Sequence, residues 1–121
     1  MINKGGSNLV LGHNLLSKVV DYIDDKKGNK ITILELKGIS IIADYFIIAT
    51  GNTTTQTKAI TDYLLEKLPE LGVPILRKEG LPEANWVLVD CGDLVIHIMT
   101  PETREFYSLE RLWGDAREVV L

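Results

Sequence analysis

The order of apolar and polar residues along the 121-residue chain predicts eight secondary-structure elements. Residues 14–27 carry an apolar stripe at helical spacing, with Asn14 as the expected N-cap and Gly28 as the terminator. Residues 31–36 and 45–50 predict strands. The second is apolar almost throughout, so we expect it to be central and covered on both faces.

A second helix is expected from Thr53, where Gln56 follows at capping-box spacing, to the Pro69 and Gly72 breakers. Residues 73–76 then predict a short strand. The unit 45–76 would be a right-handed crossover between parallel neighbours.

Residues 86–99 predict a hairpin, because two apolar runs flank Asp-Cys-Gly-Asp. A turn centred on Cys91 and Gly92 would place Trp86 directly opposite His97. Strand alternation puts five apolar side chains on one face, which we expect to be core: Val87, Val89, Leu94, Ile96 and Ile98. The other face is mixed, so we expect it to be half covered by a helix or kept for a partner.

The C-terminal segment starts with a helix signal, Thr-Pro-Glu at 100–102. Its apolar residues at helical spacing are expected in the core: Phe106, Leu109, Leu112 and Trp113. The pattern as a whole predicts a single α/β domain over residues 14–121, with a mixed sheet of about five strands and flanking helices in the order α-β-β-α-β-β-β-α. Residues 1–13 are rich in Gly and Asn and predict a flexible tail. The sequence is compatible both with a natural tail and with residues added for expression.

Composition narrows the class of protein. A net charge of −4 argues against a basic surface that clamps nucleic acid, but it is compatible with a basic protein partner. One cysteine excludes an internal disulfide and fits a reducing compartment. Neither a membrane-length apolar run nor a targeting pattern is present, so we expect a cytoplasmic protein without a membrane partner.

Three groups of residues could carry chemistry. Gly51 and Asn52 precede a helix N-terminus, where an anion could bind, although a turn and a cap explain them better. Asp90 and Asp93 could hold a metal, but a nucleotidyltransferase needs its acid pair just after the glycine turn, and that pair is missing. Capping the hairpin is the favoured role for both.

Cys91 and His97 could pair as nucleophile and base, but a turn residue and a mid-strand residue lie roughly 13 Å apart at strand rise. With His13 isolated, no zinc spacing exists, and we expect neither metal nor cofactor. Trp86 and His97 are equally compatible with core packing and with partner contact. The charges after residue 101 fit a solvated helix face or the rim of an interface.

Several motifs resemble the ribosomal silencing factor family, also called Iojap-like. They are WVLVDCGDLVIHIMTPETREFYSLERLW (residues 86–113), ADYFIIATGN (43–52), the Gln-x-Lys-Ala-Ile run (56–60) and Glu-Gly (79–80). The resemblance spans about residues 15–116, in the right order. It implies a mixed sheet with flanking helices, distantly like the nucleotidyltransferase fold.

The resemblance also implies a non-enzymatic factor that docks on ribosomal protein L-fourteen of the large ribosomal subunit. There it would block the small subunit sterically and repress translation under nutrient limitation. Contact with ribosomal RNA would be incidental, and a homodimer stays open. The expected partner-binding residues are Trp86, His97, Glu102, Arg104, Tyr107 and Glu110. The competing hypothesis is a nucleotidyltransferase-like or nucleotide-binding enzyme that uses the Gly51 turn with Asp90 and Asp93.

Overall fold

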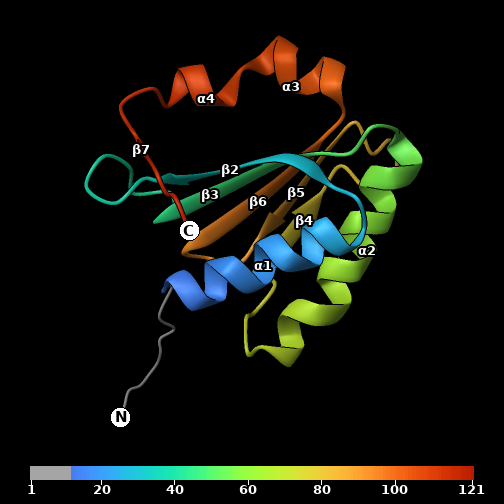
Figure 1. Ribbon diagram of the computed structural model, residues 1–121, viewed down its shortest axis with the longest axis horizontal. Helices are drawn as coiled ribbons and strands as arrows, with labels where there is room; N and C mark the ends of the chain where they lie inside the picture. Colours follow the sequence, from blue (N-terminus) through green and yellow to red (C-terminus); the bar gives the residue numbers. More distant parts are fainter. Residues whose placement is uncertain (1–11) are drawn as a thin grey trace.

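The computed structural model describes residues 12–121, which form one mixed sheet with helices on both faces (Figure 1). The elements are α1 (His13–Asp25), β2 (Asn29–Glu35), β3 (Tyr45–Thr50), α2 (Thr54–Glu70), β4 (Arg77–Glu79), β5 (Trp86–Asp90), β6 (Leu94–Met99), α3 (Pro101–Tyr107), α4 (Leu109–Leu112) and β7 (Arg117–Glu118). The predicted α/β class with a mixed sheet is confirmed. Residues 1–11 of the expected tail lie outside the described residues, and His13 belongs to α1.

The six strands are ordered β4-β5-β6-β3-β2-β7, and only β3 and β6 run parallel. All residues of these two central strands are buried, as predicted for residues 45–50. The expected strand at 73–76 is wrong: the strand begins at Arg77 and pairs antiparallel with β5 at the sheet edge. The parallel partner of β3 is therefore β6, which follows it much later in the chain.

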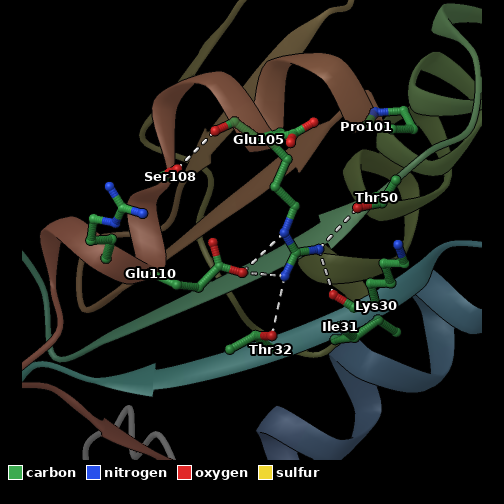
Figure 2. A pocket seen from close by; sticks show the side chains of 10 residues that line it. Lys30, Ile31, Thr32, Thr50, Pro101, Glu105, Ser108 and Glu110 are labelled. Carbon is green, nitrogen blue, oxygen red and sulfur yellow. Dashed lines mark hydrogen bonds and ion pairs between the residues drawn. The ribbon is translucent and has the colours of Figure 1, made fainter.

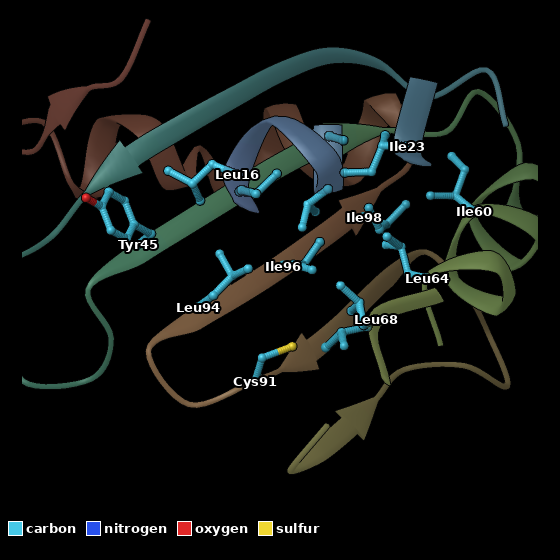
Figure 3. Close-up of a cluster of buried hydrophobic side chains, with 14 of the residues drawn as sticks. Leu16, Ile23, Tyr45, Ile60, Leu64, Leu68, Cys91, Leu94, Ile96 and Ile98 are labelled. Atoms are coloured by element: carbon cyan, nitrogen blue, oxygen red, sulfur yellow. The ribbon is translucent and has the colours of Figure 1, made fainter. Parts of the chain in front are cut away.

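One face of the sheet is covered by α1 and α2 and holds the larger core (Figure 3). The helices contribute mainly branched aliphatic side chains, among them Leu16, Ile23, Ile60, Leu64 and Leu68, all fully buried. The five hairpin residues predicted to face the core all lie in this cluster. Burial of these apolar side chains supplies most of the driving force for folding.

The start of α2 shows how local sequence sets this layer. Thr53 caps the helix by accepting the Gln56 backbone N–H at 3.1 Å, and the Gln56 Oε1 accepts the Asn52 N–H at 2.6 Å. Gly51 is buried, and a Cβ there would lie 2.7 Å from Thr57 Cγ2. The glycine therefore allows β3 and α2 to approach closely, in agreement with a turn and a cap at this site.

The hairpin turn is displaced by one residue from the prediction. Trp86 pairs with Met99 and Leu88 with His97, so the expected pairing of Trp86 with His97 is wrong. The turn is centred on Gly92 and Asp93, and Gly92 has φ 89°. Glycine with positive φ suits the first central position of a type II′ turn as well as a type I′ turn. Because the register moves by two residues, each side chain keeps its predicted face.

The opposite face of the sheet is covered by α3, α4 and the chain that follows them (Figure 1). A smaller core joins Phe46, Ile48, Val95 and Met99 to Leu109 from α4. The single apolar stripe expected here is wrong. Phe106 is 80% and Leu112 is 70% exposed.

The reason is a break in the helix. Ser108 adopts the left-handed conformation (φ 49°, ψ 56°) and separates α3 from α4, so the helical period does not continue through it. Trp113 still packs, partly buried, on the smaller core. The chain then forms β7 on the edge of β2, a strand that the pattern of the sequence did not predict.

Candidate interaction surface

Trp86 connects the sheet to the α3 layer. Its indole Nε1 donates a hydrogen bond to His97 Nδ1 at 3.0 Å, and its ring lies 4.7 Å from the Tyr107 ring, centroid to centroid. The Tyr107 ring in turn meets Phe106 edge-on at 5.0 Å. These three aromatic residues, Trp86, Phe106 and Tyr107, are called the aromatic patch below. Its outer members are exposed, Phe106 by 80% and Tyr107 by 52%.

His97 lies beneath this patch rather than in it. Only 3% of the residue is exposed, and the Phe46 ring packs against the imidazole at 4.6 Å. Burial lowers the pKa of His97 from 6.5 to about 4, because a charged imidazole would lose its hydration there. In this arrangement His97 supports Trp86 and offers no surface of its own.

Arg104 also points inward. Its guanidinium makes five hydrogen bonds. In Figure 2 these bonds are the dashed lines that run from Thr32, Thr50, Lys30 and Glu110 to one unlabelled side chain. Nε and Nη2 both donate to Glu110 Oε2, at 3.0 and 2.5 Å. Nη1 donates to the Lys30 carbonyl at 2.5 Å and to Thr50 Oγ1 at 2.9 Å. The second hydrogen of Nη2 is donated to Thr32 Oγ1 at 3.1 Å. All five N–H donors are therefore used inside the domain.

The six residues predicted to bind a partner thus divide into three settings. Trp86, His97 and Tyr107 form one aromatic stack. Arg104 and Glu110 form an ion pair whose side chains are 12% and 37% exposed. Glu102 is exposed in the first turn of α3. Sequence reasoning assigned Phe106 to the core. Its exposure depends on the break at Ser108, which the spacing of apolar residues does not reveal.

Beside the Arg104 network lies an open cleft of about 700 Å³ between β2, the end of β3 and α3–α4 (Figure 2). Exposed charges of both signs line its mouth, including Lys30, Glu105 and Arg111. The least exposed cation in it, Arg104, already has a full set of acceptors. The cleft therefore has no concentrated charge of one sign.

The residues of the enzyme hypothesis do not come together. Asp93 precedes Leu94 at one end of the β3–β6 pair, and Gly51 follows Thr50 at the other, about 20 Å away at strand rise. Asp90 accepts the Gly92 N–H at 2.9 Å, which is the capping role predicted for it. Within residues 12–121, no three His, Cys, Asp or Glu side chains are grouped so that they could hold a metal ion.

Cys91 is buried in the larger core, where burial and the neighbouring Asp90 raise the pKa of its thiol to about 12. Such a thiol is a poor nucleophile, because the thiolate is the reactive form. No helix in the described part of the chain is both long and apolar enough to cross a membrane.

Comparison with known proteins identifies relatives of this chain and of its fold. A family model described as ribosomal silencing factor during starvation matches residues 12–121. A ribosomal silencing factor of Halalkalibacterium halodurans is 46% identical over 107 residues, which are 88% of this chain and 92% of the relative. A crystal structure of a Bacillus halodurans protein has a TM-score of 0.80 at 40% identity, covering 91% of this chain and 100% of the other.

A mouse protein is more distant. It is named mitochondrial assembly of ribosomal large subunit protein 1, and it is 33% identical over 101 residues, which cover 81% of this chain and 44% of the mouse protein. The matched motifs, the shared fold and the near-complete coverage of the bacterial relative all agree. The chain belongs to the ribosomal silencing factor family.

Proposed function

We propose that this protein binds the large ribosomal subunit at ribosomal protein L-fourteen, blocks joining of the small subunit and so represses translation when nutrients are scarce. Family membership supports a ribosomal partner, and the name of the mouse relative mentions the large subunit. Binding alone performs this function, because an occupied joining face excludes the other subunit. No catalytic step is required, and the protein would act in the cytoplasm, where bacterial subunits meet.

The aromatic patch is the observation that carries this proposal. Phe106 and Tyr107 are large, exposed aromatic side chains on α3, and the Tyr107 ring packs against the Trp86 ring of β5. Aromatic residues supported by neighbours are the usual energetic centres of protein interfaces. Much of the apolar surface of both side chains lies in water, and a partner that covers it would remove that cost.

The charges near the patch favour a basic partner. Glu102 and Glu105 are exposed on the same short helix, and the chain carries a net charge of −4. Acidic rim residues steer a basic protein toward the patch and align it, with a modest effect on final affinity. In the proposed contact surface we therefore place Trp86, Phe106, Tyr107 and Glu102, with His97, Arg104 and Glu110 beneath or beside them.

The test is co-sedimentation of the purified protein with separated large and small subunits. We expect it to pellet with the large subunit alone and to slow subunit joining, followed by light scattering. Large subunits depleted of L-fourteen should lose the binding. Pelleting with both subunits equally, or with neither, would contradict the proposal. Ile41→Ala serves as the control variant, because Ile41 is a fully exposed apolar residue in the β2–β3 loop.

A further inference from the structure

Two helices, α3 with Phe106 and Tyr107 of the aromatic patch and α4 directly after it, are too short to hold themselves in place. α3 has seven residues and none is buried, while α4 has four residues and only Leu109 is buried. Isolated helices of this length are unstable in water, so tertiary contacts must hold the segment. The left-handed residue Ser108 between them adds a joint at which α3 could swing relative to α4.

The smaller core holds α4 and the residue after it through Leu109 and Trp113, whereas α3 itself is attached to the sheet at two other places. Over β5 and β6, Tyr107 rests on Trp86, which is itself hydrogen-bonded to His97. Over β2 and β3, on the other half of the sheet, Arg104 bonds to Lys30, Thr32 and Thr50. The first attachment uses two residues of the contact surface, Tyr107 and Trp86, whereas the second uses none of its aromatic residues.

Arg104 also closes the joint. Its two bonds to Glu110 run from α3 to α4 and bracket Ser108, so the angle between the helices is fixed by the same side chain that holds them on the sheet. The planar fork of arginine suits this role, because its five donors are spread over three nitrogens. A lysine ammonium has three donors on one nitrogen and would leave at least two of these bonds unmade.

We propose that Arg104 is a positioning residue, which holds residues 101–113 closed on the sheet and so presents the aromatic patch in its binding geometry. This inference rests on the proposed function for its effect on affinity. Arg104 contributes no contact to the partner. A partner that binds only the closed form sees an affinity reduced by the fraction of molecules that are closed.

The experiment compares Arg104→Lys with Arg111→Lys. Both variants replace a guanidinium by an ammonium, and Arg111 lines the same cleft but is exposed and outside the network. Hydrogen exchange at residues 101–113 and at β3 is measured for each, together with the affinity for large subunits. In Arg104→Lys we expect faster exchange in 101–113 and unchanged exchange in β3. We expect the affinity to fall by a factor equal to one divided by the fraction of molecules that are closed. If one molecule in ten stays closed, the loss is about tenfold. Arg111→Lys should match the parent in both readouts.

Three other results would overturn the inference. Unchanged exchange in 101–113 with parental affinity would mean that Arg104 does not hold the segment. Faster exchange with parental affinity would mean that the closed form is not the binding form. Weaker binding with unchanged exchange would mean that Arg104 contacts the partner directly.

Two safeguards keep the test decisive. If Arg104→Lys unfolds the whole domain, Glu110→Gln replaces it, since it removes the charge of the pair and keeps its shape. If the parent itself fails to bind large subunits, the proposed function fails, and the exchange comparison still decides whether Arg104 holds the segment.

Discussion

The indole of Trp86 donates its N–H to the imidazole Nδ1 of His97 at 3.0 Å, although the two residues are diagonal rather than opposite neighbours across β5 and β6. Because Nδ1 accepts this bond, the neutral ring carries its proton on Nε2. That nitrogen is buried and has no hydrogen-bond partner among residues 12–121. A second proton on the ring would therefore place a charge in a site that cannot stabilise it.

This arrangement predicts a loss of stability in mild acid. The pKa of His97 is about 4 in the folded protein against an ordinary 6.5, so the unfolded chain binds the proton first as the pH falls. The contribution of neutral His97 to the free energy of unfolding is complete above pH 6.5. It is lost as the pH falls from about 6.5 to about 4, by up to about 3 kcal/mol. Chemical denaturation at several pH values measures it.

Two variants isolate the effect of His97. His97→Gln removes the titrating ring, so its stability should vary less over this pH range than that of the parent. His13→Gln alters the other histidine of the chain, which is exposed, and should keep the parental slope. Equal slopes for parent and His97→Gln would show that another group controls the acid response.

Tyr107→Ala should weaken binding to large subunits by about 2 kcal/mol, or roughly 30-fold, as expected for an interface hot spot. The variant should still fold, because the tyrosine is 52% exposed and belongs to neither core cluster. Binding titrations and thermal midpoints are measured together, with Ile41→Ala as the control. Parental affinity in Tyr107→Ala would remove the aromatic patch from the proposed interface.

Glu102→Lys should weaken the same binding more at low salt than at high salt. The side chain is exposed at the start of α3, and charges of this kind act over about 10 Å at 0.1 M salt and less as salt is added. Glu66→Lys makes the same charge change on α2, across the sheet (Figure 1). A salt-dependent loss as large in Glu66→Lys would indicate a net-charge effect rather than a rim contact.

Trp113→Ala should lower the free energy of unfolding by about 3 kcal/mol. The indole packs edge-on against Phe46 at 5.9 Å and belongs to the smaller core. The adjacent Leu112 is 70% exposed, so Leu112→Ala should change stability by less than about 0.5 kcal/mol. Urea titration of the pair tests the break at Ser108. Equal losses would mean that α3 and α4 form one continuous amphipathic helix.

The hairpin illustrates how far a local pattern extends. Alternation assigned Val87, Val89, Leu94, Ile96 and Ile98 to the larger core, and the structure agrees. The pairing was wrong because Gly92 fits either central position of a two-residue turn, and the choice moves the register by two. Such a shift conserves faces but changes neighbours, and so it decided that Trp86 lies diagonal to His97.

The partner-binding role of the candidate site stays a prediction. The resemblance directed attention to residues 86–113, where Trp86 contacts Tyr107 and Glu102 is exposed in the first turn of α3. Arg104 and Glu110 were expected at an exposed rim, and both enter a network with β2 and β3 instead. No local pattern shows acceptors that lie more than 50 positions away in the chain, such as Thr50 and Thr32.

The sequence by itself determined the class of fold, the helix caps at Thr53 and Gln56, the burial of β3 and the face of each hairpin residue. These properties depend on side-chain period and on bonds between near neighbours, which the order of residues contains directly. Only the tertiary structure decided that β3 pairs with β6, that Ser108 breaks the last helix, and that Arg104 turns inward. Each of these depends on contacts between distant segments, where the gain from packing and hydrogen bonding exceeds any local preference.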